Sequence, residues 1–468
     1  MYGQKRRILC LPLLTACLFA VQSGAQARDL SLADAVDMAL AANTGLRITR
    51  QGEHKADAAL KQARGRNGVS VSASDSVRWS KTNGETQQSS NGLNLSASLP
   101  LYTGGANQAS IQSGEIGAAA ARLTTERARE DLKYEVTAAY YNAVEALKKT
   151  EVQREAVGNY DAHLGNVTAL YEAGAQARID VLRSSVELSN ARQELISAEN
   201  AYEVNLATLR NLLNMDRGEE LHLTTDVSYV PFEKTVQDCI SYAYGNRHDL
   251  QVQKDTLAQR ELAVDIAKAG KKPTVNLTVG SGITRQFRPH NDTNRDVSAS
   301  VGVNWNIFDS GVTRAQIDAA EAERDTALLN VRRTEETIDL DLRKAYLNLR
   351  EAEKRFTATG DAVKQAEEDY FIASQRYRAG EGILLDVLDA QLALSKAKQN
   401  DINARYDYAR YRAQVENLMG EPLTAAERAA ADGLPEVTQA ERDSADAANL
   451  ATSAAVQMTV AKNEVPGK

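Results

Sequence analysis

Apolar and small polar residues alternate with a period of two in four short stretches of the chain, two in each half. The apolar positions of the first stretch are Val69, Val71, Ala73, Val77 and Trp79. A period of two places these side chains on one face of a strand. The pattern predicts two β-hairpins, over residues 69–102 and 273–308, each with one apolar and one polar face. Asp75 lies on the apolar face, and the alternation does not explain it.

Proline is absent between positions 100 and 231 and again between positions 289 and 422. Because proline is the main helix breaker, each of these stretches can hold long helices, with the natural turn at Gly174 or Gly380. The predicted helices span 106–172 and 178–214 in the first half, 312–378 and 384–419 in the second, with shorter opening helices at 31–64 and 234–269. At about 1.5 Å per residue, the longest helices reach roughly 100 Å.

The two halves repeat each other at a constant offset of 206 residues. Residues 170–182 match residues 376–388, and the same offset pairs Gly105 with Gly311 at the two transitions from strand to helix. Such self-similarity predicts a tandem duplication. The expected organisation is a first structural repeat over 28–222, a second structural repeat over 223–422, and a polar, alanine-rich, disordered tail over 423–468.

The N-terminus has the layout of a secretory signal peptide over residues 1–27. A cationic run at positions 5–7 precedes an apolar run at 8–21 and a small-residue cleavage site that ends at Ala27. Cys17 also fits a lipoprotein signal, so lipidation of this cysteine stays open as an alternative to cleavage after Ala27. We therefore expect an exported chain.

Composition and charge exclude several classes of function. The net charge is −8 at pH 7, which argues against a nucleic-acid partner. No run of 18 or more apolar residues occurs, which excludes a helical transmembrane protein. The 5 histidines are scattered, and the chain has no metal-binding, phosphate-loop or nucleophile-elbow motif. We expect no enzyme activity, no catalytic residue, no cofactor and no metal.

The predicted strands have the length of tilted strands that cross a bilayer, and long polar tips connect them. Four strands do not close a barrel, because known membrane barrels begin at eight strands. An open sheet would leave backbone groups unpaired in lipid. Several chains must then share one barrel, and the strand count alone allows a dimer, a trimer or a tetramer.

Both helical turns carry the motif Tyr-x-x-Gly-x-x-x-x-x-Asp-Val-Leu, at 171–182 and 377–388, and related motifs lie at 99–105, 306–311 and 385–391. In these motifs the chain resembles the TolC family of outer-membrane efflux and type I secretion channel proteins, over about residues 30–422. The resemblance implies a mixed α and membrane-β fold. Its form would be a homotrimer with a twelve-stranded outer-membrane β-barrel, four strands per chain, continued by a long periplasmic α-helical barrel.

The function implied by the resemblance is a passive exit duct of a tripartite export system in the cell outer membrane. Its partners would be a periplasmic adaptor (membrane fusion) protein, an inner-membrane ABC or proton-driven pump, and outer-membrane lipid. The substrate would be an unfolded protein, as in type I secretion, or a small toxic compound, as in multidrug efflux. The alternative function is a periplasmic adaptor or scaffold with helical hairpins and a small β-domain. Two apolar-faced hairpins, roughly 200 residues apart, favour the channel.

The resemblance also assigns roles at the helical turns. Tyr377 matches the family's tip tyrosine, and Asp180 matches the aspartate that binds it in the closed state. Asp386 and Asp389 match the acidic positions that line the periplasmic entrance as rings. Converging carboxylates of this kind favour cations and can receive a basic partner.

One position departs from the family pattern. The family has a gating arginine five residues after the tip tyrosine, where this chain has Gly382. Either the closed-state latch is weaker here, or Arg178 or Arg183 on the other turn substitutes for the missing arginine.

Overall fold

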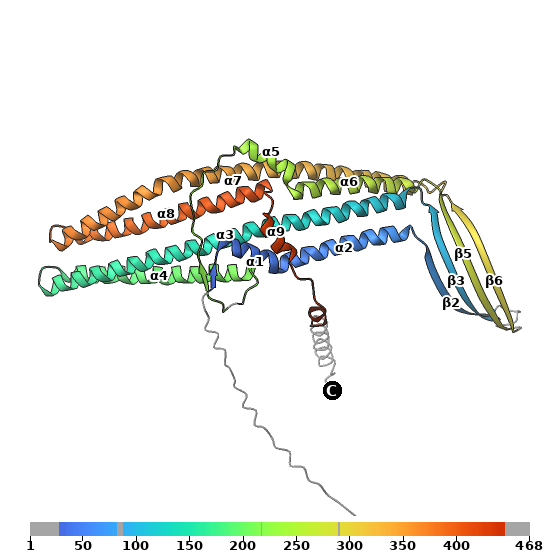
Figure 1. The fold of residues 1–468 in the computed structure, drawn as a ribbon, viewed down its shortest axis with the longest axis horizontal. Coiled ribbons are helices and arrows are strands. Elements are labelled where there is room, and N and C mark those ends of the chain that lie inside the picture. Colours follow the sequence, from blue (N-terminus) through green and yellow to red (C-terminus); the bar gives the residue numbers. More distant parts are fainter. Residues whose placement is uncertain (1–27, 82–87, 217, 289–290, 445–468) are drawn as a thin grey trace, which may run out of the picture.

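The computed structural model describes residues 28–81, 88–216, 218–288 and 291–444. The molecule is a long helical rod with a β-sheet at one end and two helical turns at the other (Figure 1). Short helices lie near the middle of the rod. The expected signal peptide over 1–27, with Cys17, lies outside the described residues.

The sheet consists of β2 (Ser70–Ser80), β3 (Gln88–Tyr102), β5 (Thr274–Arg288) and β6 (Asp292–Asn304), in that order. All neighbouring strands are antiparallel, and β3 pairs with β5, so the hairpins of the two halves lie side by side (Figure 1). Within the described part of the chain, no further strand covers the outer edge of β2 or of β6. The sheet therefore ends in two edges with backbone groups that can pair with another chain.

The register places the apolar residues of all four strands on the same face of the sheet. One cross-strand row runs through Val71, Ala97, Val279 and Ala299. On the same face, Val297 has 82% of its surface exposed. The opposite face carries mainly serine, threonine, asparagine and glycine, with Asp296 in the row of Gly282. An apolar face this exposed favours contact with lipid or with another protein.

Asp75 lies on the apolar face of β2, opposite Leu93 of β3. The side-chain amide of Asn91, diagonal to it on the same face, donates a hydrogen bond of 2.8 Å to the Asp75 carboxylate. A charged group that leaves water needs such a partner, because an unpaired one is costly to bury. The cross-strand amide therefore accounts for a residue that the alternation leaves unexplained.

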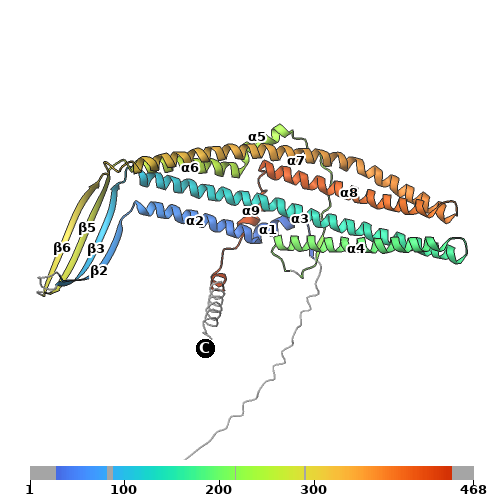
Figure 2. The ribbon, with the colours of Figure 1, turned by 180° about the vertical axis from the view of Figure 1, so that it is seen from behind.

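The longer helices of the two halves build the rod. They are α2 (Thr44–Arg66), α3 (Ala106–Glu172) and α4 (Arg178–Leu212), then α6 (His248–Ala269), α7 (Val312–Arg378) and α8 (Leu384–Met419). α3 contacts α2, α4, α6 and α8, so it joins the two halves (Figures 1 and 2). The 67 residues of α3 correspond to roughly 100 Å. None of the described helices is both long and apolar enough to cross a bilayer.

Each half opens with two helices where the sequence pattern predicts one. Asn43 separates α1 (Leu32–Ala42) from α2, and Arg247 separates α5 (Val236–Asn246) from α6. Both residues have extended backbones, with ψ of 128° and 118°. The Asn43 side chain accepts hydrogen bonds from two N–H groups in the first turn of α2 and so caps this helix. The prediction of one continuous opening helix is therefore wrong in both halves.

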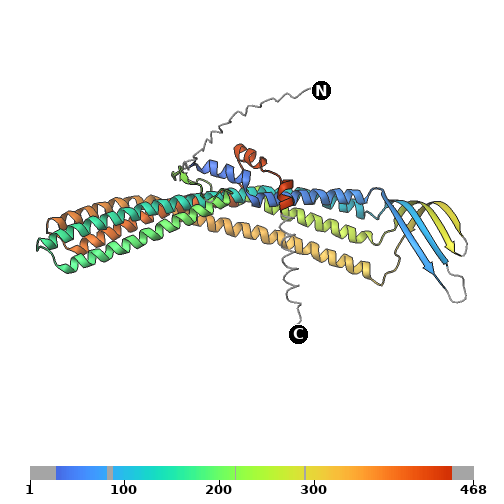
Figure 3. The same cartoon turned by 90° about the horizontal axis from the view of Figure 1, so that it is seen from below.

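The expectation of a disordered tail over 423–468 is wrong for its first part. α9 (Ala425–Asp432) begins with a capping box at Thr424 and packs against α1 (Figure 3). Alanine is the strongest helix former, and a few apolar residues such as Leu434, which is 6% exposed, bury enough surface to hold the segment. Residues 445–468 lie outside the described part of the chain.

The start and the end of the first half meet as a small parallel sheet of β1 (Arg28–Leu30) and β4 (Leu221–Leu223). The buried hydroxyl of Tyr140 in α3 fastens this sheet to the rod. It donates a hydrogen bond of 2.9 Å to the carbonyl of Leu30 and accepts one of 2.9 Å from the N–H of Thr225. The segment that leads into the second half is thereby tied to the first.

A buried carboxylate joins the two halves near the middle of the rod. Glu130 of α3 is 4% exposed, and its Oε1 lies 2.9 Å from Nδ1 of His248 at the start of α6. Arg127 lies 3.2 Å from the second oxygen of Glu130 and donates hydrogen bonds to Asn417 of α8. Glu130 raises the pKa of His248, because the carboxylate stabilises the charged imidazole.

We expect this junction to be stronger in acid. Because the pKa of His248 is raised in the folded chain, its stabilisation is complete below the unfolded pKa of about 6.5 and is lost as the pH rises through the raised value. His248→Gln should lower the free energy of unfolding by about 1–3 kcal/mol in mild acid and by less above about pH 8. Guanidinium unfolding in detergent measures this, with exposed His54→Gln as control. Equal losses at both pH values would contradict it.

Candidate functional site

The two helical turns at the far end of the rod have matching backbones. Gly174 and Gly380 follow the ends of α3 and α7, with φ of +74° and +76°. In each turn a backbone N–H returns to the last helical turn, at 2.8 and 2.9 Å. Other residues are strained at this φ, so glycine fits both turns. At the other end of these helices, Gly105 and Gly311 also have positive φ, of 97° and 92°.

The turns differ in how they bury their tyrosines. Tyr171 and Tyr377 occupy matching positions in the two repeats, yet Tyr171 is 42% exposed and Tyr377 is 2% exposed. Tyr377 packs in a cluster with Val167 of α3 and with Leu384 and Val387 of α8. Tyr377 therefore connects the second turn to the first hairpin, whereas Tyr171 belongs to no such cluster among the described residues.

The sequence pattern does not single out His163 of α3, which contacts Tyr377. The two ring centroids lie 5.2 Å apart at an interplanar angle of 50°, and His163 is 8% exposed. Burial, and after it the positive charge of Arg378, lowers the pKa of His163. The signal that could have identified it is its spacing, because Val167 lies four residues further along the same buried helix face.

Asp180, in the first turn of α4, lies close enough to Tyr377 for its charge to act on the phenol. Burial, and after it the Asp180 carboxylate, raises the pKa of Tyr377. Within the described ranges, the buried Tyr377 hydroxyl has no hydrogen-bond partner. The hydrogen bond that the family resemblance implies is therefore not formed in this structure, and the gating role of the pair stays a prediction.

Neither proposed substitute for the family's arginine forms a hydrogen bond with the Tyr377 hydroxyl among the described residues, and their gating role stays a prediction. Arg178 and Arg183 are exposed at the start of α4, and neither forms an ion pair in the part of the chain that the structure describes. A Cβ on Gly382 would lie 3.1 Å from the backbone nitrogen of Tyr377. A side chain at this position would push against the last turn of α7. Packing around Tyr377 holds this turn, together with a hydrogen bond of 3.5 Å from Arg376 to the carbonyl of Glu381.

Asp386 and Asp389 lie in the first turns of α8, beside the second helical turn. Both carboxylates are exposed, and neither has an ion pair among the described residues. Negative charge is favourable at the N-terminus of a helix, which suits Asp386 in particular. The two side chains are free to face a solvent-filled opening, and their role as entrance rings stays a prediction.

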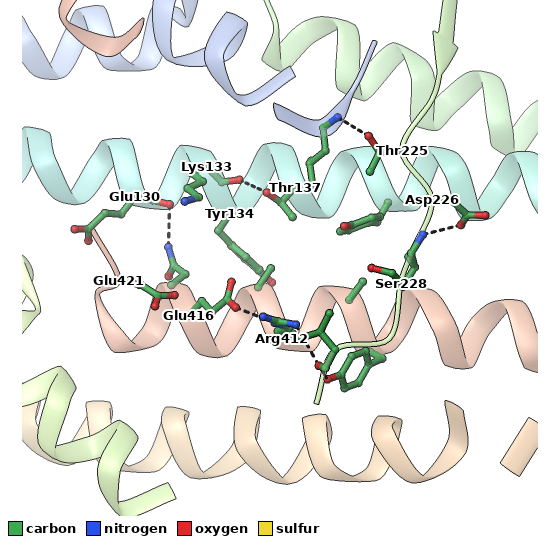
Figure 4. A pocket seen from close by; sticks show the side chains of 18 residues that line it. Glu130, Lys133, Tyr134, Thr137, Thr225, Asp226, Ser228, Arg412, Glu416 and Glu421 are labelled. Carbon is green, nitrogen blue, oxygen red and sulfur yellow. Dashed lines mark hydrogen bonds and ion pairs between the residues drawn. The ribbon is translucent and has the colours of Figure 1, made fainter. Parts of the chain in front are cut away.

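A cavity of about 360 Å³ lies between α3, α8 and the segment that connects the two halves (Figure 4). Its charged side chains are largely paired. Nε of Arg412 lies 2.9 Å from Glu416, and Nζ of Lys133 lies 2.9 Å from Glu427 of α9. No group of three or more His, Cys, Asp or Glu is placed to hold a metal ion in the described residues. We assign the cavity a structural role at the junction.

A sheet with one apolar face, attached to a helical rod of roughly 100 Å, defines the subunit of an outer-membrane channel that extends into the periplasm. A model of the outer membrane efflux protein family matches residues 35–215 and 239–421, and the chain belongs to this family. The resemblance to TolC channels is confirmed, and the chain is an outer-membrane protein with a large periplasmic part.

Curated relatives match most of the chain. Protein CyaE of Bordetella pertussis is 27% identical over 386 residues, which is 80% of each chain. The pyoverdine export outer membrane protein OpmQ of Pseudomonas putida is 23% identical and covers 69% of this chain and 68% of its own. Outer membrane protein TolC of Escherichia coli is 22% identical over 64% of this chain and 63% of its own.

Solved structures share the fold. The Campylobacter jejuni CmeC outer membrane channel has a TM-score of 0.75 and 20% identity, over 86% of this chain and 90% of its own. The outer membrane protein VceC of Vibrio cholerae has a TM-score of 0.71 and 18% identity, over 83% of this chain and 96% of its own. At these identities the likeness shows the fold alone.

We expect the ring of Tyr377, and not its hydroxyl, to hold the second turn. Tyr377→Phe should leave the turn unchanged, because the hydroxyl has no partner in the described chain. Tyr377→Ala should cost about 3–5 kcal/mol of local stability, because it leaves a cavity in the cluster. Hydrogen–deuterium exchange over residues 370–390 measures this loss.

Tyr171→Ala in the first turn is the matched control, because this tyrosine is exposed and should tolerate truncation. If Tyr377→Phe opened the turn as much as Tyr377→Ala, a hydrogen bond to the hydroxyl would be the main contact, as the family resemblance implies.

Proposed function

We propose that three copies of the chain form one twelve-stranded barrel in the outer membrane, continued by a periplasmic α-helical barrel. The single observation that carries this proposal is the four-stranded sheet, with an exposed apolar face and unpaired edges at β2 and β6. Barrel closure removes such edges, and one chain has too few strands to close alone. Pairing between copies turns the apolar face toward lipid and the polar face toward the lumen.

The barrel is then the passive exit duct of a tripartite export system, driven by an inner-membrane ABC or proton-driven pump through a periplasmic adaptor protein. Membership of the efflux protein family supports this role. The relatives differ in cargo by name, since OpmQ is described as a pyoverdine exporter. We propose export of proteins or of small toxic compounds. The alternative of an adaptor or scaffold is not favoured, because the strands form one open layer and not a compact β-domain.

The family model matches the chain twice, and the two segments contain the same order of elements. This supports the proposal that the chain is a tandem duplication with repeats over 28–222 and 223–422. Each copy would then contribute two hairpins to the barrel and two helical hairpins to the periplasmic tube.

In this assembly Asp386 and Asp389 of the three copies converge on the periplasmic opening. Three copies bring six carboxylates to one aperture, which favours cations. The paired change Asp386→Asn with Asp389→Asn should abolish the preference for cations over anions without closing the channel. Reversal potentials in planar bilayers under a potassium chloride gradient measure this.

Glu368→Gln with Asp369→Asn is the matched control. It removes the same charge from exposed positions of α7 that have no ion pair in the described chain. Unchanged selectivity in the Asp386 and Asp389 variant, or equal loss in the control, would show that these aspartates do not line the entrance.

A further inference from the structure

His163 of α3 is a buried titratable residue that contacts Tyr377. It is 8% exposed, its Nε2 has no hydrogen-bond partner among the described residues, and its ring lies against the ring of Tyr377 at 5.2 Å. A buried imidazole in this state is neutral, because the charged form would lose its hydration without gaining a partner.

The carboxylates nearest to His163 are already paired with a lysine. His163 lines a cavity of about 410 Å³ between α3, α7 and α8. Glu155 of α3 and Glu367 of α7 are the carboxylates of this cavity, and both bind Nζ of Lys398 in α8, at 2.9 and 3.3 Å. The other charged and titratable groups facing the site are Arg378, Tyr370 and Tyr377 of α7, with Asp180 of α4 acting on Tyr377.

We propose that His163 is a positioning residue of the helical tip, which holds Tyr377 in its cluster while the imidazole is neutral and releases it when the imidazole gains a proton. The proposal rests on the function proposed above, in which the turns surround the periplasmic opening. It adds a proton-controlled release that depends on this chain's own histidine.

The surroundings of His163 determine whether acid stabilises or destabilises the packed tip. Burial and Arg378 lower the pKa of His163 in the packed tip that the structure shows. In a tip whose cluster has opened, the ring would reach water and its pKa would return to the ordinary value of about 6.5. The free energy of the packed tip therefore rises relative to the opened tip as the pH falls below about 6.5. This cost stops growing once the pH has fallen below the lowered pKa of His163. At the middle of the rod acid has the opposite effect on stability, because it strengthens the Glu130–His248 pair. Acid should loosen the tip while the junction between the halves holds.

The test is the conductance of the reconstituted full-length channel at about pH 7.5 and about pH 5.5, a window above the ordinary pKa of aspartate. The wild type should open as the pH falls. In each chain, the ratio of open to closed tips should rise by about tenfold for each unit by which the pKa of His163 differs between the two tips. His163→Gln and His163→Phe have no proton to gain, so their conductance should not change over this window. His163→Phe keeps a ring against Tyr377 and should also stay closed.

His54→Gln is the control, since this histidine is exposed on α2 and should leave the wild-type response intact. A wild type without a pH response, or a response that survives in both His163 variants, would overturn the proposal. Tyr377→Ala distinguishes a failure of the proposed channel function from a failure of the proposed role of His163. If it does not conduct at either pH, the proposed channel function fails. If it conducts while the wild type shows no pH response, only the role of His163 fails.

Should the His163 variants not assemble, the wild-type protein decides the matter. A nuclear magnetic resonance titration of its histidine rings in detergent, assigned by substituting the other histidines, gives the pKa of His163 directly. A value below about 6.5 supports the proposal, and a value at or above it overturns it.

Discussion

The pairing of backbone groups in lipid is the constraint on which the rest of the structure depends. The sheet ends at β2 and β6, and each N–H or C=O left unpaired in hydrocarbon costs several kcal/mol. In the proposed assembly, further copies of the chain would satisfy these groups, with β6 of one copy paired to β2 of the next. The face that carries Val71 and Val297 then meets lipid, and the proposed assembly follows from the strand edges before any side-chain interface is considered.

The helical rod continues from the sheet. Contacts between elements that are distant in the sequence hold the rod together at two places, its middle and its tip. At the middle, Tyr140, Glu130 and His248 join elements that are distant in the sequence, and α9 packs alongside them. At the tip the fastening is smaller and centres on Tyr377 against His163. The tip cluster contains fewer buried residues than the clusters at the middle of the rod, and a segment with fewer buried apolar contacts costs less to open. This difference supports the proposal that the tip opens while the middle of the rod stays packed.

The strands and the long helices could be predicted from the sequence because their signals are local: a period of two around Val71, and long stretches without proline. The breaks at Asn43 and Arg247 could not, because an extended residue between two helices is favoured over a continuous helix only once both helices have packed. The different burial of Tyr171 and Tyr377 could not be predicted from the sequence either. Their local sequences match, and only neighbours from distant helices distinguish them.

The mass of the detergent-solubilised mature protein tests the central claim most directly. Light scattering corrected for bound detergent, with negative-stain images of the same sample, gives the number of chains and the shape. The account predicts three chains in an elongated hollow particle with a helical part of roughly 100 Å. A monomer that stays in solution without detergent would contradict it, because the edges of β2 and β6 would then need no partner.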